Sequence, residues 1–125
     1  MQTLVTVHSW VRWLVLAALV LGAVVGVVRY RSNAKWRESV FQLGVMTVDI
    51  QVLIGIVIWI ERKGWNYSFF FKILHPTSML LALVVAHFGL ALAKRRNDVR
   101  SSLVVGGSFA IALVLIVGAI PWDRL

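Results

Sequence analysis

The chain has no cysteine, few charged residues and only two prolines. Without cysteine it cannot form disulfides, thiolate-bound iron–sulfur clusters or the thioether links of c-type haem. Charged residues make up 14% of its 125 residues, whereas about 25% is usual in soluble domains. The sequence also lacks a P-loop, a GxSxG elbow and an HExxH motif. We therefore expect a membrane protein that is not catalytic on its own.

Apolar residues are abundant instead, at 60% of the chain with a mean hydropathy of +0.86. Four apolar stretches have the roughly 20–25 residues that a helix needs to cross about 30 Å of hydrocarbon: Leu4–Val28, Val40–Ile60, Ile73–Ala93 and Leu103–Trp122. Their hydrophobicity is continuous, which argues against a β-barrel. Short breaks between them predict an all-α, antiparallel bundle of four transmembrane helices, a single domain over residues 1–125.

The net charge of +8 follows the loops between these stretches, so it indicates membrane topology and contact with lipid headgroups, not nucleic-acid binding. The first and third loops hold four basic residues each, and the second holds three: Arg29, Arg31, Lys35, Arg37; Lys94, Arg95, Arg96, Arg100; Arg62, Lys63, Lys72. The positive-inside rule then predicts cytoplasmic first and third loops and both termini on the periplasmic side of a bacterial plasma membrane. No basic segment precedes the first stretch, which favours a retained helix over a cleaved signal peptide.

Histidine supplies the most informative polar groups, because ionisable residues inside a membrane point to function. His8 and Arg12 are one helical turn apart and share a face with Val15, Leu19, Gly22 and Gly26. The two glycines form a GxxxG pattern that lets another helix approach closely. Arg12 lies too deep to remain without an anion, and the candidates are a carboxylate, a cofactor propionate or a lipid phosphate.

The other two histidines lie in the third stretch. The sequence His75-Pro76 predicts the start of that helix with His75 as its N-cap. The stripe from His75 continues through the mostly small residues Met79, Ala82, Ala86, Gly89 and Ala93. His87 is about 18 Å deeper and on another face, so only His8 and His75 are placed at a depth where they could bind one ion. Helix packing through hydrogen bonds is the alternative role for each histidine.

Two polar residues of the second stretch are also candidates. Asp49 lies near mid-membrane, and we expect it to form an ion pair with Arg12, from which it differs by roughly 5 Å in depth. A role in proton relay is the alternative. Gln51 shares a different face with Gly44, Thr47 and Gly55. That face predicts either a hydrogen bond between helices or a contact with a quinone or tetrapyrrole.

Aromatic residues gather around the second loop, and small residues fill the last stretch. Trp59, Trp65, Tyr67 and the run from Phe69 to Phe71 predict an interfacial belt, with a ligand or partner surface as the alternative. The fourth stretch has no internal ionisable group and predicts a packing helix that Pro121-Trp122 ends.

Several short motifs together resemble a family of small four-helix bacterial membrane proteins described as "cytochrome b-like". They are His8-Ser9-x-x-Arg12-Trp13, Gln51-x-Leu53-Ile54-Gly55, His75-Pro76-x-x-Met79-x-x-Ala82, Ala86-His87-x-Gly89 and Pro121-Trp122. The resemblance implies haem b held in the bundle by histidines, with His8, His75 and His87 as candidates. This chain has Asp49 where we expect a histidine in the family, and Leu74 where we expect an acidic residue. If the position of Asp49 supplies a ligand paired with His87, only the outer pair of His8 and His75 could still hold a cofactor.

These observations favour a small integral-membrane subunit of a respiratory or photosynthetic, quinol-linked electron-transfer complex. It would bind haem b or another tetrapyrrole through His8 and His75 as axial ligands, because neutral imidazole suits both haem iron and the magnesium of a chlorin. Arg12 would offset a propionate charge. The alternatives are a quinone in place of the tetrapyrrole, a scaffold subunit without a cofactor, and a small transporter or proton-conducting protein with Asp49 and Arg12 on its path. We expect lipids and other membrane subunits as partners.

Overall fold

The computed structural model describes residues 2–33 and 38–120, and every regular element within them is helical. Two short helices, a 3₁₀ turn and a π-helical segment, lie between the second and third of the long helices. The elements are α1 (Gln2–Arg31), α2 (Glu38–Glu61), η1 (Gly64–Asn66), η2 (Phe70–Leu74), α3 (His75–Arg96) and α4 (Val99–Gly118).

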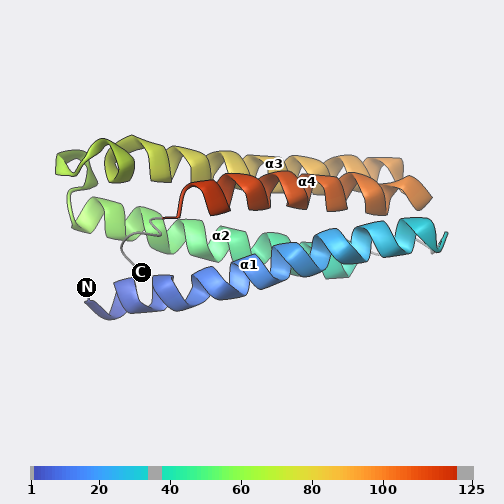
Figure 1. Ribbon diagram of the computed structural model, residues 1–125, viewed down its shortest axis with the longest axis horizontal. Helices are drawn as coiled ribbons and strands as arrows, with labels where there is room; N and C mark the ends of the chain where they lie inside the picture. The colour runs from blue at the N-terminus through green and yellow to red at the C-terminus, as the bar shows by residue number, and fades with distance from the viewer. Residues whose placement is uncertain (1, 34–37, 121–125) are drawn as a thin grey trace.

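The four long helices run alternately up and down in one bundle (Figure 1), so the predicted all-α bundle is confirmed. α1 begins, α4 ends, and α2 connects to α3 at the same end of the bundle, which we call the N-terminal end. Each helix is long and apolar enough to cross a membrane, and η2 extends the third of these spans: Thr3–Arg31, Ser39–Glu61, Phe70–Arg96 and Val99–Gly118. The chain therefore has the helices of a multi-pass membrane protein.

The connection between α3 and α4 is shorter than predicted, because Asn97 ends α3 and Asp98 caps α4. α3 continues to Arg96 and stops at Asn97, whose left-handed φ of 49° suits asparagine. The next residue, Asp98, caps α4: its side chain accepts from backbone amides, and Ser101 Oγ accepts from the amide of Asp98. The predicted break over residues 94–102 was thus too wide, because a capping box lets α4 begin at Val99. α4 also ends earlier than predicted, at Gly118, and Pro121-Trp122 lies outside the described residues.

The α-helix α3 starts at His75, as predicted, but His75 is not its N-cap. A π-helical segment, Phe70–Leu74, runs directly into α3, and Leu74, the residue before His75, already has helical backbone angles. Pro76 lies at the start of α3 and has no amide hydrogen to donate to the preceding turn. A wider π turn accommodates such an interruption without ending the helix. His75 therefore lies inside a continuous span, one turn from its end.

Small residues bring α4 close to both of its neighbours, as the predicted stripes require. A Cβ atom placed on Gly26 of α1 would lie 2.5 Å from the Ser102 carbonyl oxygen and 2.9 Å from the Gly106 Cα. On the other side, a Cβ atom on Gly89 of α3 would lie 2.0 Å from Ser108 Oγ. The backbones of these helices can approach this closely only because these positions are glycine.

One aromatic ring fills the centre of the bundle. Phe109 of α4 is fully buried and lies against the glycines at positions 22 and 44, where no larger side chain would fit. It meets the buried Phe41 edge-on, with 5.9 Å between ring centroids. By contrast, α2 and α3 pack less extensively on each other than α4 packs on its neighbours. The bundle is therefore tight along α4 and looser between α2 and α3.

The contact at Gly26 leads to a first prediction. Gly26→Ala places a methyl group against the α4 backbone, so we expect the free energy of unfolding in mild detergent to fall by about 1–3 kcal/mol. Gly107→Ala is the matched control, because no atom lies within 4 Å of a Cβ placed there. It should change stability by no more than about 0.5 kcal/mol. Equal stability of the two variants would contradict the close approach of α1 and α4.

Candidate functional site

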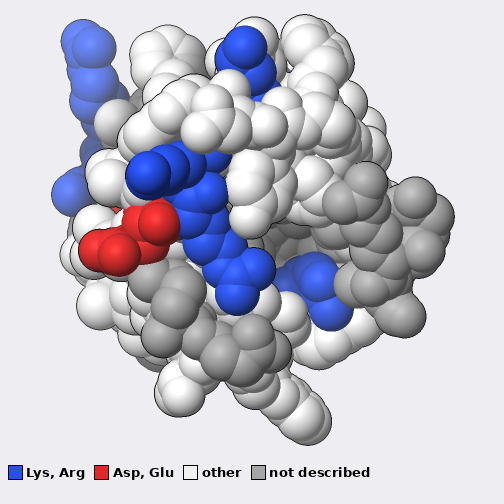
Figure 2. All heavy atoms as spheres, turned by 90° about the vertical axis from the view of Figure 1, so that its left-hand side faces the viewer, with Lys and Arg blue, Asp and Glu red and all other residues white. Residues whose placement is uncertain are grey.

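A cavity of about 730 Å³ lies at the N-terminal end of the bundle. Residues of all four long helices and of the α2–α3 connection line it. Seen from this end, basic side chains lie around a hollow in the surface (Figure 2). A volume between about 300 and 1,000 Å³ is typical of sites for small molecules and cofactors.

His75 lies on the cavity wall with its ring fixed by a backbone contact. Its Nδ1 is 2.8 Å from the carbonyl oxygen of Ala119, just beyond α4. A carbonyl only accepts, so Nδ1–H donates and the lone pair of the neutral ring is on Nε2. The rings of Phe70 and Phe71, with centroids 5.9 and 6.2 Å away, hold the imidazole from the side. Metal-ligating histidines are typically fixed in this way, by a hydrogen bond from the other ring nitrogen.

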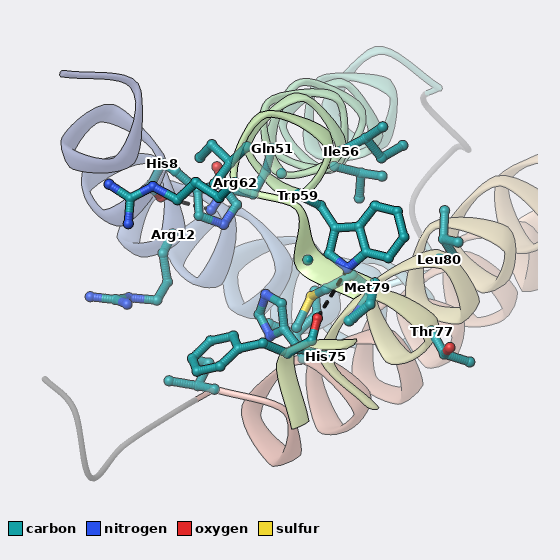
Figure 3. A pocket seen from close by; sticks show the side chains of 18 of the residues that line it. His8, Arg12, Gln51, Ile56, Trp59, Arg62, His75, Thr77, Met79 and Leu80 are labelled. Carbon is teal, nitrogen blue, oxygen red and sulfur yellow. Dashed lines mark hydrogen bonds between the residues drawn. The ribbon is translucent and has the colours of Figure 1, made fainter. Parts of the chain in front are cut away.

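His8 projects from α1 toward the same space as His75 (Figure 3). Its Nδ1 is buried and has no hydrogen-bond partner among the described residues. Gly55 of α2 makes room for the ring, because a Cβ atom there would lie 3.2 Å from His8 Cε1. The two histidines start from similar depths, since His8 is about 9 Å from the beginning of α1 and His75 about 8 Å from the beginning of η2. The cavity thus brings together the pair that the sequence singled out.

Gln51 joins α2 to α1 beside His8. Its Nε2 donates to the carbonyl oxygen of His8 at 2.8 Å, so the predicted hydrogen bond between helices is confirmed. Its Oε1 is buried without a partner among the described residues. Gln51 and His8 are thus neighbours at the contact of α2 with α1, and both residues line the cavity.

Arg12 and Arg62 lie on the same side of the cavity, next to His8 (Figure 3). The guanidinium of Arg12 stacks on Trp13 with its Cζ 4.9 Å from the ring centroid, while its buried Nε has no hydrogen-bond partner in the described part of the chain. Lys72 lines the same cavity. These cations give the site a positive potential that would attract an anionic group.

The expected pairing of Arg12 with Asp49 was wrong. Asp49 Oδ1 is instead 2.6 Å from His87 Nε2, which links α2 to α3. The reason is helical geometry: Asp49 is two residues from Gln51, about 200° around the helix, and Gln51 faces α1. Neither Asp49 nor His87 lines the cavity. Of the candidate residues from the sequence, the cavity therefore unites His8, Arg12, Gln51 and His75 and leaves Asp49 and His87 as a separate pair.

Trp59, which was predicted to belong to an interfacial belt or to a ligand or partner surface, forms a wall of the cavity. Its Nε1 donates to the carbonyl oxygen of Phe71 at 3.2 Å, a contact drawn in Figure 3. Its ring occupies the space that a Cβ atom on Gly64 would need and meets Trp65 edge-on. The contact fixes η2, and with it His75, against the end of α2. In the sequence, Gly64 five residues after Trp59 was the one pattern that could have indicated this packing.

The cavity offers two imidazoles as possible ligands, from His8 and His75. Within residues 2–33 and 38–120, no three side chains of His, Cys, Asp or Glu gather as metal ligands. A tetrapyrrole already supplies four nitrogen ligands and needs only axial imidazoles from the protein. Two histidines on a largely apolar cavity with cations nearby are compatible with that need.

Comparison with protein-family models, with curated proteins and with solved structures found no match for the chain. The function must therefore be argued from the residues of the cavity.

A second prediction concerns Gln51. In Gln51→Leu the His8 carbonyl keeps its helical hydrogen bond, and a buried oxygen without a partner is removed. We therefore expect the free energy of unfolding to change by less than about 1 kcal/mol, measured by denaturation in mild detergent without added ligand. A clearly larger loss would mean that the amide serves the fold and not a bound molecule.

Proposed function

We propose that the protein is a small integral-membrane subunit of an electron-transfer complex and that it binds haem b in the N-terminal cavity. In this proposal His8 and His75 would hold the haem iron. The observation that carries it is the pair itself: two imidazoles from different helices on one cavity, His75 with its Nδ1–H committed to Ala119 and His8 with an unpartnered Nδ1. The resemblance to small "cytochrome b-like" proteins supports the same cofactor.

Different residues of the cavity would contribute to haem binding in different ways. His75 presents Nε2 in a fixed direction, since the hydrogen bond to α4 and the two phenylalanine rings limit rotation of the imidazole. Arg12 and Arg62 provide positive charge for the propionates. Apolar side chains of α2 and α3, such as Val52 and Met79, exclude water from the remainder of the cavity. When bound, haem b would supply reversible one-electron transfer.

The surroundings of the cavity suit a subunit of a larger complex. The described residues form membrane-spanning helices with short connections, so a soluble electron donor has little surface of this chain to dock on. The positive-inside rule puts the cavity near the periplasmic face, where a quinol-linked partner could exchange electrons. In this proposal the donor and acceptor sites belong to neighbouring membrane subunits.

The third prediction tests the ligands. The reduced-minus-oxidised absorbance spectrum of protein purified from haem-replete membranes should show a b-type band. His8→Ala and His75→Ala should each reduce it at least tenfold, because each removes an axial ligand. His87→Ala is the control, since that histidine lies outside the cavity, and it should retain the band.

Absence of the band from the wild-type protein, together with absence of chlorin absorbance, would contradict the proposal and favour a subunit without a pigment. Loss of the band in His87→Ala alone would move the site to the pair between α2 and α3.

The fourth prediction concerns the charge of Arg12. A cation near haem stabilises the reduced form, which has one more electron, so Arg12→Gln should lower the midpoint potential. Arg31→Gln at the opposite end of α1 is the control and should leave the potential unchanged. Potentiometric titration in detergent measures both. An unchanged potential in Arg12→Gln would place the haem away from this arginine.

A further inference from the structure

A polar pair lies on the outer surface of the bundle at the middle of the membrane. Asp49 is near the centre of the span Ser39–Glu61, about 16–18 Å from either end of α2. Its side chain is 39% exposed and that of its partner His87 is 48% exposed. Three of the residues one turn away on the same two helices are apolar and exposed: Met46, Leu53 and Val84. The pair is thus a polar island on a surface otherwise suited to lipid.

Such a position is unfavourable for a monomer in lipid. Ionisable residues inside a membrane almost always face a protein interior or a water-filled cavity. The Asp49–His87 pair does neither, because it is outside the cavity and much of both side chains is uncovered. The surface around it is therefore expected to face protein in the membrane.

The chemistry of the pair indicates what covers it. Nε2 of His87 donates to Oδ1 of Asp49. Within the described residues, His87 Nδ1 and Asp49 Oδ2 form no hydrogen bond. A protonated ring offers a second donor at Nδ1, and the carboxylate offers a second acceptor at Oδ2. Each copy of the chain thus presents one donor and one acceptor side by side, which complement the same groups on another copy.

We propose that this surface is the interface of a homodimer, in which a two-fold axis beside Asp49 and His87 joins the pairs of the two copies. Each His87 Nδ1–H then donates to Asp49 Oδ2 of the second copy, and the four side chains form a ring of alternating charge. An interface of this kind is isologous, so the same patch serves on both copies. A different membrane helix would need its own matched donor and acceptor, which a second copy supplies by symmetry.

The absence of cysteine makes the interface directly testable. Single cysteines at Leu53→Cys and Val84→Cys lie on the proposed interface, and Ile111→Cys on α4 is a control with the same 57% exposure as Val84. With the polar pair intact, oxidation in proteoliposomes of the purified chain should link Leu53→Cys or Val84→Cys into dimers. Ile111→Cys should give at least tenfold less. Linkage at Ile111→Cys and at neither of the others would overturn the proposal.

A second measurement examines the polar pair itself. Single-molecule photobleaching of the chain labelled at Ser32→Cys should show mostly two steps in dilute proteoliposomes. The double variant Asp49→Leu/His87→Leu leaves no unpaired polar group and so should still fold, but the dimer fraction should fall at least tenfold. Gln42→Leu, which removes another exposed polar group of α2, is the control and should remain dimeric.

A monomeric wild-type chain would overturn the proposal, as would a double variant that remains dimeric. A surface that cross-links in native membranes only to other proteins would also overturn it and assign the surface to a different subunit. The result is independent of the haem proposal, because dimerisation needs no pigment and the double variant should keep its b-type band if the cavity binds haem.

Discussion

The close packing of α4 against α1 and α3 is the constraint on which the rest of the structure depends. Gly26 and Gly106 meet backbone to backbone, and Gly89 admits Ser108, so these helices cannot separate without losing extensive contact. Lipid tails are as apolar as the side chains, which leaves van der Waals packing and hydrogen bonds to hold membrane helices together. α2 and α3 pack less extensively on each other, and the cavity lies at the N-terminal end, lined by residues of all four long helices.

The same arrangement explains why the polar residues fall into two groups with different surroundings. His8, Arg12, Gln51 and His75 point into the space that opens at the end of the bundle. Asp49 and His87 bridge α2 and α3 farther along, where the outer surface continues into apolar side chains. The first group lines the cavity for which we propose a cofactor, and the second lies on the surface for which we propose contact with another polar pair. A membrane protein this small could thus bind a ligand and associate through separate surfaces.

The sequence predicted the four spans and the packing stripes well, because both depend on local periodicity and residue size. Gly26 and Ala86 lie in close helix contacts, as the spacing of small residues indicates. Helix ends were predicted less well, since the π segment before His75 and the capping box of Asp98 extend helices into polar sequence. The hydropathy of these residues does not reveal the backbone and side-chain hydrogen bonds that form there.

The candidate site could be predicted only in part, for reasons of helix rotation. Depth along a helix follows from counting residues, and His8 and His75, which the count set at one level, both line the cavity. Which neighbour a residue faces depends on how the helices turn in the bundle, so the pairing of Asp49 with His87 and not with Arg12 was missed. The hydrogen bond from Trp59 to the Phe71 carbonyl depends on the path of the α2–α3 connection, and no sequence periodicity predicts that path.

The electron paramagnetic resonance spectrum of the oxidised, haem-loaded protein tests the central claim most directly. Two imidazole ligands from His8 and His75 predict a low-spin ferric signal, and removal of either ring predicts conversion to a high-spin signal with one axial position open. A wild-type spectrum that is high-spin, or a low-spin spectrum that survives both His8→Ala and His75→Ala, would contradict the claim that these histidines share one haem.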